Sequence, residues 1–161
     1  MKIIGCMVVV FALAGCRQVP AHGYVPVSQY DPRRDADKDI NDAIAEAHRT
    51  GKRVLLETGG EWCKWCHIMD KYFKDHPKLA ELRDRNYITV KINFSEENLN
   101  EKVLSRYPKI HGYPHIFILD TDGKVLQSQN TGELEEGQGY NLDKFTAFLT
   151  GWARRVEAPK S

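Results

Sequence analysis

The sequence lacks the features that nucleic-acid-binding and membrane-spanning proteins require. Its 161 residues contain 23 Lys and Arg against 22 Asp and Glu, so there is no basic excess to attract nucleic acid. No apolar run reaches the roughly 18 to 20 residues that a membrane-spanning helix needs. We therefore expect no nucleic-acid partner and no integral membrane protein. The composition, 42% apolar and 28% charged, is typical of one folded domain.

Cysteine is also scarce, with four residues in the chain. Cys6 and Cys16 belong to an apolar N-terminal stretch and its end, which leaves only Cys63 and Cys66 for the folded part. This count excludes a four-cysteine zinc site, and we expect no metal and no cofactor. In an exported domain, a single pair of thiols is more typical of redox chemistry than of a structural bridge.

The N-terminus has the pattern of an export signal. Residues 1–15 contain one Lys near the start and an apolar stretch that is too short to span a membrane but typical of a signal peptide. The stretch ends in Leu-Ala-Gly before Cys16, which resembles the lipobox of bacterial lipoproteins and implies a lipid on Cys16. An ordinary signal peptide with an incidental cysteine is the alternative. Arg17 stands where an Asp would retain such a protein at the inner membrane, so we expect an envelope protein that faces the periplasm, with the outer membrane preferred.

The rest of the chain is predicted to be a tether followed by one domain. Residues 16–34 contain several prolines and little periodicity, which indicates a tether, and the domain covers residues 35–161. Apolar spacing in this domain predicts the following elements: helices at 37–50, 77–85, 96–107 and 142–155, a further helix that opens at Cys63, strands at 54–56 and 87–94, and a hairpin of 116–119 with 125–126. This order indicates an α/β fold with a central mixed sheet and helices on both faces.

Three motifs in this domain resemble the thioredoxin family, over essentially all of residues 37–155. They are Val-Leu-Leu-Glu at 54–57, Glu-Trp-Cys-Lys-Trp-Cys at 61–66 and Gly-Tyr-Pro at 112–114. The chain is similar to exported members such as the C-terminal domain of transmembrane thiol reductases. The resemblance implies a thioredoxin-like fold, a cis bond before Pro114 and thiol:disulfide exchange. Lys64-Trp65 and His115 depart from the family's frequent Gly-Pro and Thr, which leaves the redox direction open.

The position of the two cysteines on a helix predicts their roles. A cysteine in the first turn of a helix meets free N–H groups and the positive end of the helix dipole, and both favour the thiolate. Cys63 has this position, and Lys64 and a protonated His67 would lower its pKa further. Cys66 lies one turn deeper. We therefore expect Cys63 to attack a partner's disulfide and Cys66 to resolve the mixed disulfide.

Resolution requires a proton acceptor, and Glu57 is the candidate. It ends a buried strand, where loss of solvent should raise its pKa toward the working pH, so that it can accept the proton of Cys66 through water. A surface carboxylate at a strand end is the alternative. Glu57 is favoured because its position corresponds to the buried acid of the family.

The partners are expected to be proteins that carry disulfides, together with a protein that donates thiols. Trp62, Trp65 and Tyr113 would form an apolar surface around the cysteines, which suits a protein partner, although Trp65 could equally be a core residue. The backbone of Tyr113, before a cis Pro114, could bind an extended substrate in the manner of a strand. The acid beneath Cys66 favours a reductant over an oxidant.

Two other functions fit part of the pattern. Cys63-Lys64-Trp65-Cys66-His67 also satisfies CxxCH, the attachment motif of c-type haem. The buried strand that leads into the motif and the preceding Trp argue against haem. A redox-silent binding module is the second alternative, and the presence of both cysteines and Glu57 argues against it.

Overall fold

A four-stranded mixed sheet forms the centre of the protein. The structure is a computed structural model that describes residues 23–154. The strand order is β2 (Tyr87–Asn93), β1 (Arg53–Gly59), β3 (His115–Leu119) and β4 (Val125–Asn130). β1 is parallel to β2 and antiparallel to β3, and β3 forms an antiparallel hairpin with β4. The predicted central mixed sheet is confirmed.

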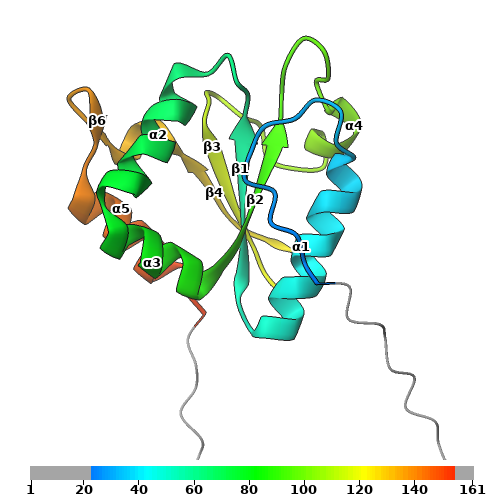
Figure 1. The fold of residues 1–161 in the computed structure, drawn as a ribbon, viewed down its shortest axis with the longest axis horizontal. Coiled ribbons are helices and arrows are strands. Elements are labelled where there is room, and N and C mark those ends of the chain that lie inside the picture. The colour runs from blue at the N-terminus through cyan, green and yellow to red at the C-terminus, as the bar shows by residue number, and fades with distance from the viewer. Residues whose placement is uncertain (1–22, 155–161) are drawn as a thin grey trace, which may run out of the picture.

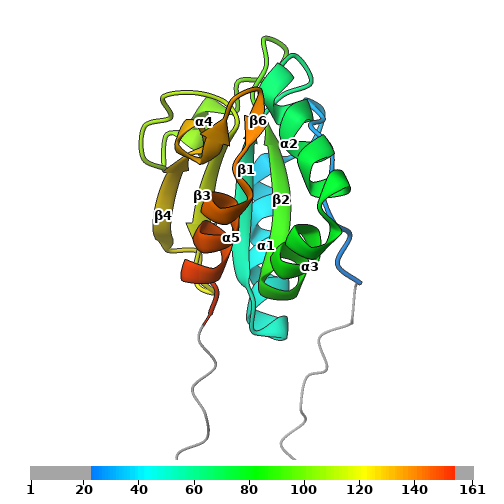
Figure 2. The same ribbon diagram turned by 90° about the vertical axis from the view of Figure 1, so that its left-hand side faces the viewer.

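Helices cover both faces of the sheet (Figure 1). α1 (Ala36–Thr50) and the short α4 (Glu101–Leu104) lie on one side. α2 (Lys64–Asp75), α3 (Pro77–Asn86) and α5 (Leu142–Gly151) lie on the other. The chain between β4 and α5 forms the 3-10 turn η1 (Thr131–Leu134) and the small pair β5 (Glu135–Glu136) and β6 (Gly139–Tyr140). Figure 2 shows the sheet with β4 at one edge and β2 at the other.

Alternation along β1 divides the core between these two faces. Val54 and Leu56 pack in the cluster beneath α1, whereas Leu55 packs in the cluster beneath α2 and α5. Successive strand residues point to opposite faces, so a continuous apolar run is what a strand buried on both sides requires. This apolar run places Glu57, which follows it on the inner strand β1, in the interior of the molecule, and the chain then continues into the loop before α2.

The segment before α4 corrects one prediction. The helix predicted for 96–107 is wrong over most of its length, because α4 covers only Glu101–Leu104. Asparagine side chains hold the preceding loop: Asn93 donates to the carbonyl of Asn98 over 3.0 Å, and Asn100 donates to the carbonyl of Asn93 over 2.7 Å. Such side-chain bonds offer the backbone an alternative to a helix. α5 is also shorter than predicted and ends at Gly151.

The end of the predicted tether is packed against the sheet. Val27, 5% exposed, forms a parallel bridge with Val90, and the N–H of Lys91 donates to the carbonyl of Val27 over 3.0 Å. Tyr30 is 4% exposed. The folded part therefore begins before residue 35, because Val27 pairs along the open edge of β2 and the Tyr30 side chain is buried. The predicted signal peptide and Cys16 lie outside the described residues. Among residues 23–154, no helix is long and apolar enough to cross a membrane.

Candidate active site

Cys63 and Cys66 form a disulfide at the start of α2, with their Cα atoms 5.3 Å apart. Cys63 is the N-cap of the helix, and its Sγ accepts a hydrogen bond from the N–H of Cys66 over 3.2 Å. A thiolate at this position would be stabilised by the same N–H and by the helix dipole. Cys66 is fully buried and Cys63 is 3% exposed, so Cys66 is the deeper of the two, as expected.

Gly59, the last residue of β1, allows the backbone to lie directly against the disulfide. A Cβ at this position would be less than 3.0 Å from Sγ of Cys66 and 2.9 Å from Oη of Tyr30. Only glycine leaves room for both atoms. The sulfur of Cys66 and the hydroxyl of Tyr30 therefore lie beside the same point of β1.

Glu57 is buried two residues earlier on the same strand, with 2% of its surface exposed. Burial raises its pKa, while Lys91 and the hydrogen bond from Tyr30 oppose the rise. The expected burial and the expected direction of the pKa shift are both present. Desolvation disfavours the charged carboxylate, which is why burial raises the pKa of Glu57 above its ordinary value.

Lys91 on β2 compensates the charge of Glu57 and was missed in the sequence. It is the register partner of Glu57, and its Nζ lies 3.6 Å from Oε1. The same Nζ donates to both carboxylate oxygens of Asp70 on α2, over 2.6 and 2.7 Å, and lies 4.6 Å from the ring centre of Tyr30. A lysine within an alternating strand of Ile and Val was the available signal, since buried charges are almost always paired.

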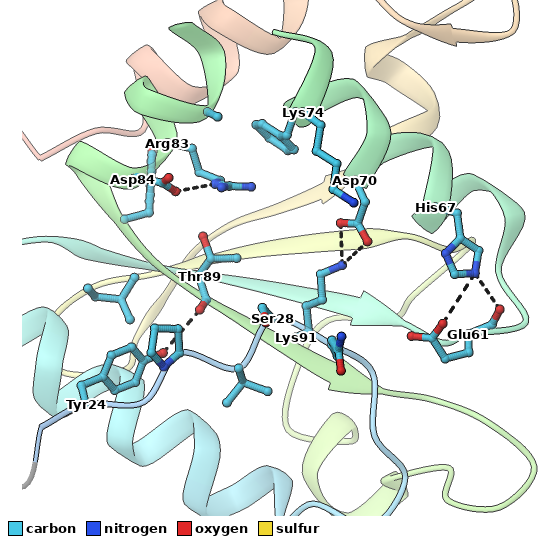
Figure 3. Close-up of a pocket in the computed structure, with 17 residues that line it drawn as sticks. Tyr24, Ser28, Glu61, His67, Asp70, Lys74, Arg83, Asp84, Thr89 and Lys91 are labelled. Carbon is cyan, nitrogen blue, oxygen red and sulfur yellow. Dashed lines mark hydrogen bonds and ion pairs between the residues drawn. The ribbon is translucent and has the colours of Figure 1, made fainter. Parts of the chain in front are cut away.

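A cavity of about 780 Å³ lies beside this group, between the N-terminal segment, α2, α3 and β2. Figure 3 shows Lys91 extending from β2 to meet Asp70 of α2 at the cavity wall. The side chain of Asp70 is 36% exposed. The buried charges below the disulfide are thus connected to solvent through Asp70.

An aromatic surface lies on the outer side of the disulfide. Trp62 is 58% exposed, contacts Tyr113 edge to face with ring centres 5.6 Å apart, and donates from Nε1 to the carbonyl of Phe94 over 2.6 Å. Phe94, which sequence reasoning missed, stacks on Tyr113 at 4.8 Å. The Tyr113–Pro114 peptide bond is cis, as the resemblance implied. Trp62, Phe94 and Tyr113 are called the aromatic patch below.

Trp65 is placed differently from the other predicted binding residues. It is half-buried and contacts Tyr140 edge to face at 5.7 Å, although it also packs against the cysteines. Its ring therefore supports the core beneath α2 as much as it borders the disulfide.

The two histidines near the site are engaged with other groups. His67 hydrogen-bonds through Nε2 to the carbonyl of Glu61 at 2.8 Å. His115 is 2% exposed and its Nε2 contacts Oγ of Ser128 at 2.8 Å, and burial lowers its pKa to about 4. Within residues 23–154, no group of three or more His, Cys, Asp or Glu side chains is placed to hold a metal ion.

The fold and the site together define a class of protein: a thioredoxin fold whose CxxC pair opens the helix after a central strand. A family model described as Thioredoxin-like matches residues 35–121, and the chain belongs to this family. Membership and the bond between the two sulfurs support a redox pair over haem attachment, since haem would require both sulfurs for thioethers.

Comparisons with known proteins agree with this family. The chain is 30% identical over 122 residues to the thiol:disulfide interchange protein DsbD of Pseudomonas fluorescens, and 27% identical over 120 residues to DsbD of Salmonella typhimurium. The matches cover 74% and 73% of this chain but 19% of each relative, so the chain spans about a fifth of their length.

Solved structures show the same fold. The disulphide isomerase of Xylella fastidiosa Temecula1 aligns with a TM-score of 0.65 at 27% identity, covering 76% of this chain and 94% of that one. The oxidised C-terminal domain of Neisseria meningitidis DsbD aligns with a TM-score of 0.52 at 20% identity, covering 71% and 94%. The second likeness concerns the fold alone.

Proposed function

We propose that this protein reduces disulfides of protein partners in the bacterial cell envelope through Cys63 and Cys66. The observation that carries the proposal is the buried Glu57, which has a raised pKa and lies two residues before Gly59, the end of the strand that lies against the inner cysteine. A group that can accept a proton near neutral pH is what a resolving thiol requires. The relatives are thiol:disulfide interchange proteins, which supports the same chemistry.

The reaction proceeds in two exchanges. The thiolate of Cys63 attacks one sulfur of the partner's disulfide, forms a mixed disulfide and releases the other partner sulfur as a thiolate. Cys66 then gives its proton to Glu57, and its sulfur attacks Cys63. The Cys63–Cys66 disulfide forms, and the second partner thiolate leaves and takes up a proton. Two electrons pass to the partner's disulfide. A protein that donates thiols must then supply two electrons to reduce the Cys63–Cys66 disulfide again.

The aromatic patch and the backbone of Tyr113 are proposed to bind the partner. Trp62 is exposed, and apolar aromatic surfaces are enriched where proteins bind proteins. An extended segment that carries the partner's cysteine would pair with the Tyr113 backbone beside the cis bond. Trp65, which packs against the cysteines, is proposed to form the part of this binding surface nearest the core.

The location is proposed from the sequence. Residues 1–15 would be removed as a signal peptide, and a lipid on Cys16 would anchor the domain on the periplasmic side, with the outer membrane preferred.

The experiment is an intact-mass measurement on protein taken from its native envelope, quenched in acid and alkylated. We expect two alkyl groups on Cys63 and Cys66 and a lipid on Cys16. A persistent Cys63–Cys66 disulfide in cells with an active thiol donor would contradict the reductant direction. A haem-sized adduct on the pair would contradict disulfide exchange altogether.

A further inference from the structure

Tyr30 belongs to the buried group around the disulfide, although it lies outside the matched family region, which begins at residue 35. Its hydroxyl donates a hydrogen bond to Oε1 of Glu57. The same hydroxyl and Sγ of Cys66 lie beside Gly59, against one point of β1. The hydroxyl is thus placed next to both the acid and the sulfur between which a proton must pass.

The segment that carries Tyr30 is fixed at both ends. Before Tyr30, the carbonyl of Val27 accepts the N–H of Lys91 over 3.0 Å. After it, the carbonyl of Pro32 accepts Nδ2 of Asn98 over 2.8 Å. The ring of Tyr30 also faces the ammonium of Lys91. Because these contacts anchor the segment to β2 and to the loop after it, the hydroxyl is held in place by the fold.

We propose that Tyr30 is a positioning residue for disulfide exchange: its hydroxyl holds the Glu57 carboxylate beside Cys66 and stabilises its charged form. The inference rests on the proposed function, since it concerns the resolving step of that reaction. While Cys66 attacks Cys63, the proton moves from the Cys66 sulfur to Glu57, and Tyr30 keeps its own proton. The N-terminal segment, read from its composition as a tether, thereby becomes part of the active site.

Glu57 is faced by groups from several elements, and all of them influence its titration. They are Tyr30, Asp70, Arg83 and Lys91. Lys91 and Arg83 favour the carboxylate, whereas Asp70 opposes it. Tyr30 is the neutral donor that contacts the carboxylate in this set, so removing its hydroxyl changes one hydrogen bond and no charge.

The test follows the two phases of reaction between the reduced protein and dithiobis-nitrobenzoate. Attack by Cys63 on the reagent releases the first thionitrobenzoate at a rate that depends on the reagent concentration. Attack by Cys66 on Cys63 releases the second at a rate that does not. Cys6 and Cys16 are replaced by Ser in all variants, so that only the pair reacts. The pH dependence of the second phase is compared in the parent protein and in Tyr30→Phe, which keeps the ring.

Tyr30→Phe removes a hydrogen bond to the charged form of Glu57 and should therefore raise the pKa of Glu57. We expect the acid limb of the pH profile of the second-phase rate to move upward by about one pH unit. The first phase should not change. Tyr24→Phe is the matched control, since Tyr24 lies on the same segment and its hydroxyl bonds to the carbonyl of Thr89 at 3.4 Å, away from Glu57. Carbon NMR of the Glu57 carboxyl should show the same upward shift without turnover.

Three outcomes would count against parts of this account. Superimposable profiles of the parent and Tyr30→Phe would overturn the role of Tyr30. An equal shift caused by Tyr30→Phe in a Glu57→Gln background would show that Tyr30 does not act through Glu57. A parent protein without any second phase would instead overturn the proposed function itself. Thermal unfolding of each variant confirms that a changed profile does not reflect a lost fold.

Discussion

Nζ of Lys91 lies 3.6 Å from Oε1 of Glu57, across the parallel pair β1 and β2, and both side chains are at least nine-tenths buried. The ammonium favours the carboxylate form of Glu57, but burial disfavours it more strongly, so that the pKa of Glu57 remains above its ordinary value. A buried ion pair of this kind rarely increases stability overall, because the loss of hydration can exceed the attraction. Its presence beneath a disulfide is therefore better explained by chemistry than by folding.

Glu57→Gln should stabilise the oxidised protein at neutral pH and slow resolution. A carboxyl whose pKa is raised on folding costs stability as the pH rises from the unfolded value, 4.5, through the folded value. Gln removes this cost, while Lys91 keeps both bonds to Asp70. We expect a melting temperature a few degrees higher at pH 7.5, no gain below pH 4, and a second phase about 100-fold slower at neutral pH.

Thermal unfolding at the two pH values measures the melting temperatures, and stopped-flow mixing measures the rate of the second phase. Asp75→Asn is a suitable control, since Asp75 lies at the end of α2 and pairs with Lys71 at the surface. Equal stability of Glu57→Gln and the parent protein at pH 7.5 would contradict the raised pKa, and an unchanged second phase would remove Glu57 from the mechanism.

The two cysteines should respond differently to substitution. Cys63→Ser should abolish exchange, because it removes the attacking sulfur. Cys66→Ser should retain attack but trap partners as mixed disulfides, because the resolving sulfur is absent. Affinity purification under non-reducing conditions, followed by reduction and mass spectrometry, separates the two cases. Loss of exchange in both variants without trapped partners would contradict this division of roles.

Most of the fold could be predicted because its signals are local. The continuous apolar run that became β1, the alternation of Ile88, Val90 and Ile92 in β2, and the hairpin of β3 and β4 all appear where periodicity and turn residues indicated them. The short length of α4 was not predicted, because the loop before it is held by asparagine contacts between residues several positions apart. Such contacts leave no periodic pattern in the sequence.

The site was predicted less completely, for a related reason. Cys63, Cys66 and Glu57 belong to motifs that can be read in order along the chain. Tyr30 and Lys91 reach Glu57 only through the pairing of β1 with β2 and the docking of the N-terminal segment on β2. A segment with three prolines and little periodicity resembles a tether until some of its apolar side chains, such as Val27 and Tyr30, are seen to be buried.

Trp62→Ala should weaken exchange with protein partners while sparing a small disulfide. The side chain is exposed and forms the outer part of the aromatic patch, so it can contact a protein that is large enough to reach it. We expect about a tenfold loss in kcat/KM with a protein substrate, as for a typical aromatic interface residue. The rate with dithiobis-nitrobenzoate should stay the same. Leu142→Ala, which removes an exposed apolar side chain outside the patch, is the control. Equal losses with both substrates would show that Trp62 acts on the cysteines and not on the partner.

His115 should make the protein sensitive to acid. Burial lowers its pKa from 6.5 to about 4, with His111 acting in the same direction and Glu133 opposing it. The unfolded chain therefore binds a proton at a higher pH than the folded chain, so the stability contributed by neutral His115 is present above pH 6.5 and is lost as the pH falls toward 4.

His115→Thr removes this titration but also leaves space beside Phe117, whose ring lies 4.7 Å from that of His115. The variant should be less stable than the parent protein at pH 7.5. Its melting temperature should nevertheless fall less between pH 7.5 and 4.5, by several degrees, because the folded state no longer has to exclude a proton that the unfolded state accepts. Parallel curves of melting temperature against pH for the two proteins would show that His115 is not held neutral by burial. Melting temperatures that converge at low pH are instead the result expected from the contacts that enclose the His115 ring.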